Sequence, residues 1–194
     1  MNKEEQWIQT FTGKKFYPFS PKVEDICIED IAHALSLICR FNGHCREFYS
    51  VAQHSCLVSG LCGAKRKNAS KYHQDLAKLG LLHDAAEAYL GDIARPIKSR
   101  EDDDRERWLF HKIKQVFGLD EYAPKLDEEI ARHDASTLAC EKAILIPHYL
   151  EWPGVTNVDP KFITIVPWAP EEAEAKFLIR FDFLFGEKGN QDAR

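Results

Sequence analysis

No uninterrupted apolar run in this 194-residue sequence approaches the roughly 18 residues that a membrane-spanning helix needs. The first residues, MNKEEQW, also lack the basic and then apolar segments of a secretion signal. Positive charge is not in excess either, because the net charge is −5, and bulk attraction to a DNA or RNA duplex or to an anionic membrane is not expected. We therefore expect a cytoplasmic protein that has neither a nucleic-acid duplex nor a membrane as its partner.

Closely spaced cysteine pairs are also missing. None of the six cysteines forms a CxxC motif, as a zinc ribbon would require. A disulfide framework does not suit a chain of this length that lacks a secretion signal. We expect reduced thiols, mostly buried, that pack as small hydrophobic side chains. They are Cys27, Cys39, Cys45, Cys56, Cys62 and Cys140.

What is present is an ordinary globular composition, with 44% hydrophobic and 29% charged residues. This composition excludes disordered, collagen-like and coiled-coil chains, and the length fits a single domain over residues 1–194. An aromatic-rich segment at about 1–24 predicts an irregular arm or a short hairpin packed on the body. A polar tail is expected at about 187–194.

Apolar residues recur at helical spacing through most of the chain. Ser50 is a plausible N-cap, and Gly91, Gly118 and Gly186 follow three of the periodic segments. A short strand is expected only at about 162–166. We predict an all-α bundle of five or six main helices. Their ranges are about 24–39, 50–62, 70–90, 100–117, 124–149 and 170–185.

The most informative motif is Leu82-His83-Asp84-Ala85-Ala86-Glu87, within the predicted helix at 70–90. Glu87 follows His83 by four residues and Asp84 by three, which would place the three polar side chains on one helix face. The flanking residues are apolar, so this face is expected to point inward. Burying such a group is unfavourable unless something compensates it, and a divalent cation would do so.

His54 and Asp134 lie in apolar helical contexts elsewhere in the chain. An isolated helical histidine is more often a hydrogen-bonded core residue than a metal ligand, and we read the other six histidines in that way. The ordered set of His54, His83-Asp84 and Asp134 favours a metal site. Two imidazoles and two carboxylates suit one divalent transition metal such as Mn, Co, Fe, Ni or Zn.

The order H…HD…D resembles the HD-domain metal-dependent phosphohydrolase superfamily. The stretches YSVAQHS, HDAAEAYLGDI and ITIVPWAPEEA are similar to its 5′-deoxynucleotidase-like branch in bacteria, prophages and phages. Some phage members of that branch are deoxyadenosine triphosphohydrolases. The resemblance covers about residues 9–185, and it implies an HD-domain bundle, a deoxynucleotide substrate and a homo-oligomer, as a dimer or larger assembly.

The resemblance also implies roles for individual residues. Glu87 matches the catalytic acid/base, and Asp92 matches a loop aspartate near the substrate, which we assign to catalysis and to substrate binding. Phe41 stands where related 5′-deoxynucleotidases carry Trp, and Arg95 also departs from the usual pattern, so the substrate side differs more than the metal side. His54, His83, Asp84 and Asp134 match the metal ligands; Arg40, Phe41, Arg95 and Lys98 are the further candidates for binding substrate.

These residues lead us to expect a metal-dependent hydrolase of deoxynucleotide phosphates. Two reactions fit: removal of phosphate from a deoxynucleoside 5′-monophosphate, and removal of triphosphate from a dNTP such as dATP. The second would bring an additional Mg²⁺ with its substrate. The alternatives are a non-catalytic nucleotide-binding regulatory module and a (p)ppGpp hydrolase. A cyclic-dinucleotide phosphodiesterase is disfavoured, because the sequence has no GYP motif.

Overall fold

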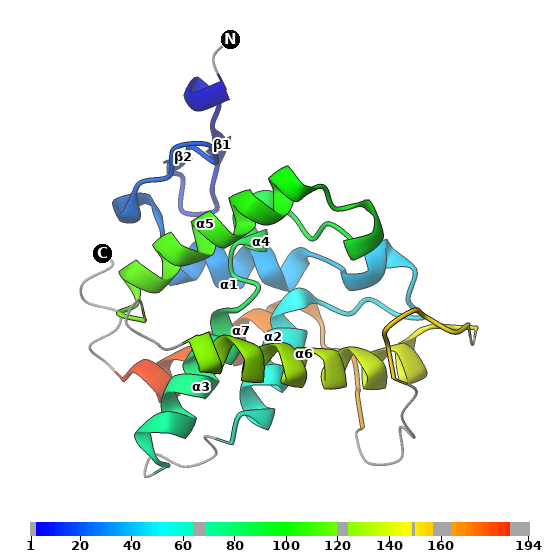
Figure 1. Cartoon of the computed structure of the whole chain (residues 1–194). Coiled ribbons are helices and arrows are strands. Elements are labelled where there is room, and N and C mark those ends of the chain that lie inside the picture. Colours follow the sequence, from blue (N-terminus) through cyan, green and yellow to red (C-terminus); the bar gives the residue numbers. More distant parts are fainter. Residues whose placement is uncertain (1–2, 64–68, 120–123, 149, 157–163, 187–194) are drawn as a thin grey trace.

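The computed structural model describes residues 3–63, 69–119, 124–148, 150–156 and 164–186, which are predominantly helical (Figure 1). The all-α prediction is confirmed. The predicted tail at 187–194 lies outside the described residues. The α-helices are α1 (Ile28–Leu37), α2 (Val51–Leu61), α3 (Lys71–Leu82), α4 (Glu87–Leu90), α5 (Arg100–Val116), α6 (Pro124–Leu145) and α7 (Pro170–Phe185).

The N-terminal arm is a hairpin, in which β1 (Ile8–Gln9) pairs antiparallel with β2 (Lys15–Phe16). Phe16 is fully buried and its ring stacks on Tyr89 at a centroid distance of 4.0 Å. The carboxylate of Asp30 on α1 accepts hydrogen bonds from the backbone N–H and the hydroxyl of Thr12, at 2.7 and 2.9 Å. The expected arm is thus a short hairpin attached to α1.

Helix α2 is central to the packing, because it contacts α1, α3, α6 and α7. Its first residues, Val51 to Ser55, are all buried. The hydroxyl of Ser50 accepts the backbone N–H of Gln53 at 3.1 Å, which confirms the predicted N-cap. In Figure 1, α6 runs across α2 and α3. One turn of α2 and the middle of α6 are thereby brought together.

The prediction of one continuous helix at 70–90 is wrong. Helix α3 ends at Leu82, and α4 begins only at Glu87. Between them the N–H of Ala85 bonds to the carbonyl of Leu82, and that of Glu87 bonds to the carbonyl of Asp84. Such bonds over three residues wind the chain more tightly than an α-helix. Glu87 therefore does not share one continuous helix face with His83 and Asp84.

Other boundaries also differ from the predictions. The first helix starts at Ile28 rather than near residue 24, because a 3-10 turn (Val23–Asp25) precedes it. Helix α6 ends at Leu145, shortly before Pro147, which lacks the N–H that a longer helix would need. Residues 164–166 form no strand, and the rest of the predicted strand lies outside the described ranges. All six cysteines are free, as expected.

Candidate metal centre

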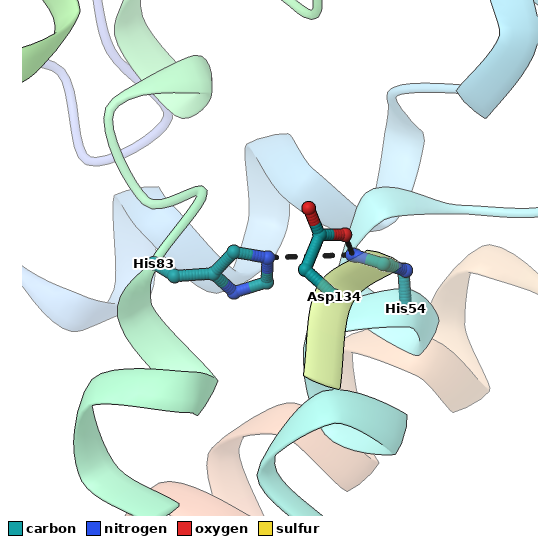
Figure 2. Close-up of side chains that lie close together, drawn as sticks. All are labelled: His54, His83 and Asp134. Carbon is teal, nitrogen blue, oxygen red and sulfur yellow. Dashed lines mark hydrogen bonds and ion pairs between the residues drawn. The ribbon is translucent and has the colours of Figure 1, made fainter. Parts of the chain in front are cut away.

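Three separate elements bring His54, His83 and Asp134 together (Figure 2). His54 comes from α2, His83 from the turn after α3, and Asp134 from α6. Nε2 of His54 lies 3.3 Å from Nε2 of His83 and 3.1 Å from Oδ1 of Asp134. One potential ligand atom from each of the three residues lies within 4.8 Å of the others, so the group can hold a metal ion.

Asp84 joins this group from the side of the turn. Its Oδ2 lies 3.2 Å from Nε2 of His83 and 3.6 Å from Nε2 of His54. All four residues predicted as metal ligands therefore converge, although the chain between His83 and Glu87 is not the α-helix that the prediction assumed. We call His54, His83, Asp84 and Asp134, the four candidate ligands, the metal centre.

The hydrogen bonds on the far side of each imidazole determine what the ring can offer. Nδ1 of His54 lies 2.7 Å from the carboxylate of Glu141, and Nδ1 of His83 lies 2.9 Å from the carbonyl of Gly80. Both partners are acceptors, so each Nδ1 carries the proton. In the neutral rings both Nε2 lone pairs then face each other and the carboxylates. This arrangement requires a cation between them, either a proton or a metal.

The pKa shifts indicate the same need for positive charge. Burial and the nearby Arg40 disfavour a charged His54, but Glu141 and Asp134 outweigh them and raise the pKa of His54 to about 9. Burial also opposes ionisation of Asp84, yet His83 and His54 hold its pKa below the usual range. The pKa of Asp134 is lowered as well, mainly by His54 against the effect of burial. A divalent metal fits this donor set.

The predicted substrate residue Arg40 lies beside the metal centre. Its side chain is only 11% exposed, with Nη1 3.7 Å from Oδ2 of Asp84 and Nη2 3.2 Å from Oε2 of Glu141. Phe41 and Asn42, the next two residues, have left-handed φ angles of 57° and 51°. This conformation is unfavourable for residues other than glycine. The strained loop thus carries a charged residue at the metal centre.

Sequence reasoning missed Glu141 and Tyr49. Glu141 is fully buried on α6, and its Oε1 accepts a hydrogen bond from the Tyr49 hydroxyl at 2.6 Å as well as one from His54. Burial opposes ionisation, but His54 and Arg40 lower the pKa of Glu141 to about 2. A signal did exist, because Glu141 follows Asp134 by seven residues, which is two helical turns on the same face.

Glu87, the predicted acid/base, is 7% exposed, and its Oε2 has no hydrogen-bond partner among the described residues. Burial and the negative charges of Asp84 and Asp92 raise the pKa of Glu87 to about 10. Burial also raises the pKa of Asp92, although Arg40 opposes this shift. Glu87 therefore retains its proton at neutral pH in the metal-free protein.

Lys98 and Arg95 are the remaining residues predicted to bind substrate. Lys98 forms ion pairs with Glu106 and, at 3.8 Å, with Asp103, and it also interacts electrostatically with Glu87. Arg95 is exposed on the 3-10 turn Arg95–Ile97.

Among the described residues, no helix is both long enough and apolar enough to cross a membrane.

No family model matches the chain. Individual known proteins, however, are similar to it in sequence. It is 38% identical over 95 residues to an uncharacterized protein of Rhodobacter capsulatus, covering 48% of this chain and 47% of that protein. It is 36% identical over 182 residues to the uncharacterized protein YfdR of Escherichia coli strain K12, covering 92% of this chain and 95% of YfdR. The chain therefore belongs to the same family as YfdR.

Proposed function

We propose that the protein is a metal-dependent phosphohydrolase of the HD type that acts on deoxynucleotide phosphates. The observation that carries the proposal is the convergence of His54, His83, Asp84 and Asp134, with both Nε2 atoms directed at the carboxylates. Two imidazoles and two carboxylates suit Mn, Co, Fe, Ni or Zn. When bound, such a metal supplies a more acidic water and a positive charge for a phosphoryl oxygen.

Arg40 is the residue that would bind the phosphate. Its guanidinium lies beside Asp84 at the edge of the metal centre, and its buried Nε has no hydrogen-bond partner among the described residues. A guanidinium can bind two oxygens of a phosphate at once through parallel N–H groups. Arg40 therefore supports a substrate whose phosphate lies against the metal centre.

Glu87 supports hydrolysis rather than binding alone. Its carboxyl group is buried beside Asp84, and burial together with the charges of Asp84 and Asp92 raises its pKa in the metal-free protein, which favours the protonated acid. Release of a nucleoside 5′-hydroxyl requires a proton on the departing oxygen, and a buried carboxylic acid can donate one. A regulatory module that only binds nucleotides would not need this proton donor.

We favour a deoxynucleoside 5′-monophosphate as the substrate. A triphosphate requires several cations along its length, whereas Lys98 already has Glu106 and Asp103 as partners. Hydrolysis of dATP or another dNTP, with its additional Mg²⁺, is the second reaction compatible with the same centre. A homo-oligomeric state, which the resemblance to the deoxynucleotidase-like branch implies, belongs to the same proposal, as does the cytoplasmic location expected from the sequence.

The test is a panel of dNMPs, dNTPs and ribonucleotides incubated with the protein and Mn²⁺ or Co²⁺, with products resolved by chromatography. Nucleoside and inorganic phosphate from dNMPs are expected. Nucleoside and triphosphate from dATP would identify the second reaction, and no turnover with either metal would contradict the proposal.

Asp84→Ala should lose activity, whereas Asp104→Ala, at an exposed carboxylate paired with Arg107, should not. Glu87→Gln should lower turnover by about 10²- to 10⁴-fold.

A further inference from the structure

We propose that Glu141 is a positioning residue that holds both the metal ligand His54 and the anion-binding Arg40, and so couples metal binding to anion binding. The inference rests on the proposed function and deepens it. Asp84 also lies near both residues, but it is itself part of the metal centre. Outside that centre, within the described part of the chain, Glu141 is the carboxylate that pairs with both.

The two oxygens of Glu141 have different partners. Oε1 accepts hydrogen bonds from Nδ1 of His54 at 2.7 Å and from the hydroxyl of Tyr49 at 2.6 Å. Oε2 forms an ion pair with Nη2 of Arg40 at 3.2 Å. The Glu141 side chain has no exposed surface, and its orientation therefore depends on these protein partners rather than on water.

The contact with His54 selects the tautomer of a metal ligand. Because Nδ1–H of His54 donates to Glu141, the lone pair of Nε2 is directed towards Asp134, His83 and Asp84. Such carboxylate partners orient a ligating imidazole and make it a better donor, and their replacement typically weakens metal binding about 10- to 100-fold. Tyr49 in turn orients the carboxylate.

The contact with Arg40 positions a cation at the same centre. Nη2 of Arg40 is held by Glu141, while Nη1 lies 3.7 Å from Oδ2 of Asp84. The guanidinium therefore lies next to the oxygen that faces both imidazoles. Its Nε is buried with no partner among the described residues, so the group has capacity left for an anion.

A purely structural role would not account for this arrangement. Burying a carboxylate is unfavourable, and a buried ion pair often contributes no more stability than apolar side chains of similar volume. Here Glu141 accepts a hydrogen bond from the proposed metal ligand His54 and forms an ion pair with Arg40, which lies beside Asp84, and Tyr49 supports that geometry. The Glu141 carboxylate therefore positions His54 and Arg40 rather than stabilising the fold.

The test uses Co²⁺ and inorganic phosphate as probes and does not depend on activity. Binding of Co²⁺ is followed by its visible absorption spectrum, and phosphate is then titrated into the Co²⁺-loaded protein. Glu141→Gln keeps an oxygen that can accept hydrogen bonds from His54 and Tyr49. Its NH₂ group, however, faces the N–H groups of Arg40, so two hydrogen-bond donors oppose each other. We expect Co²⁺ binding about tenfold weaker, with an altered spectrum. Phosphate binding should also weaken about tenfold, because Arg40 is displaced.

Tyr49→Phe is the matched control. It removes one hydrogen bond to Glu141 but leaves the carboxylate charge, the His54 contact and the Arg40 ion pair in place. We expect a smaller effect than that of Glu141→Gln on both affinities. Circular dichroism checks that each variant is folded. If Glu141→Gln does not fold, Glu141→Asp is measured instead, because it keeps the charge but shortens the side chain. We expect Glu141→Asp to lower the affinities for both Co²⁺ and phosphate.

The outcomes separate the inference from the proposed function. Wild-type protein that binds no Co²⁺ would overturn the metal centre and the inference with it. If the wild-type protein binds Co²⁺ and Glu141→Gln changes neither affinity, only the role of Glu141 is overturned. A loss of Co²⁺ affinity with unchanged or tighter phosphate binding would overturn the coupling.

Discussion

His54 has a charged or polar partner on each ring nitrogen even though its side chain is completely buried in α2. With its pKa raised to about 9, the ring of the metal-free protein carries a second proton at neutral pH, shared with Asp134. A metal that binds Nε2 must displace this proton. Metal binding is therefore expected to release a proton and to strengthen as the pH rises towards 9.

Glu87 leads to a prediction about stability in the metal-free protein. Its native pKa is about 10 instead of 4.5, so between these pH values the folded state binds more protons than the unfolded state. The free energy of unfolding then falls as the pH rises, by at most about 1.4 kcal/mol per pH unit. Glu87→Gln cannot ionise and should remove this contribution.

The measurement is urea denaturation of chelator-treated wild-type and Glu87→Gln protein from pH 5 to pH 9. His54 has a raised pKa too, and its contribution falls over the upper part of this range in the same direction. It is present in both proteins, so the difference between the two slopes isolates Glu87. Parallel pH profiles would show that Glu87 ionises normally in the folded protein.

At the scale of elements, the start of α2 determines where His54 lies. The hydroxyl of Ser50 is buried and caps the N–H of Gln53, immediately before His54. Ser50→Ala should lower the free energy of unfolding by about 1–2 kcal/mol, because a buried N–H loses its acceptor.

Ser70→Ala is the matched control for that prediction. Ser70 caps α3 in the same way, through the N–H of His73, but its environment is exposed. Water can replace the lost bond there, and we expect a loss nearer to about 0.5 kcal/mol. Urea denaturation of the three proteins gives the comparison. An equal loss at both caps would mean that burial of Ser50 adds nothing.

The comparison of elements also shows what the sequence could predict. Helical spacing and the cap at Ser50 were sufficient to locate α2, and the ordered His and Asp residues were sufficient to name side chains that the fold brings together. The turn from His83 to Glu87 was not predictable from spacing, because the residues Ala85 and Ala86 favour a helix and only the local three-residue hydrogen bonds interrupt it. Glu141 was missed because its role depends on partners from distant segments.

At the scale of the molecule, the metal centre joins α2, the turn after α3, and α6, three segments that are far apart in the chain. A ligand that binds only the folded state stabilises it by mass action, by about 2.7 kcal/mol at a free concentration 100 times its dissociation constant. Removal of the metal should therefore lower the midpoint of thermal unfolding, and re-addition of Mn²⁺ or Co²⁺ should restore it.

Asp84→Ala serves as the reference in this experiment, because it removes one of the four proposed ligands while the other three remain. Its unfolding midpoint should respond to the metal much less than that of the wild-type protein. If chelator and metal change the two proteins equally, the stabilising ion binds somewhere other than at this centre.

The seven-residue separation of Asp134 and Glu141 on α6 has a consequence for how the family can vary. Each residue of an α-helix turns by about 100°, so one residue inserted or deleted between these positions would rotate one carboxylate away from His54. Substitutions at exposed positions of this segment leave that geometry unchanged. Relatives that keep the centre are therefore expected to differ in sequence between these two positions but not in length.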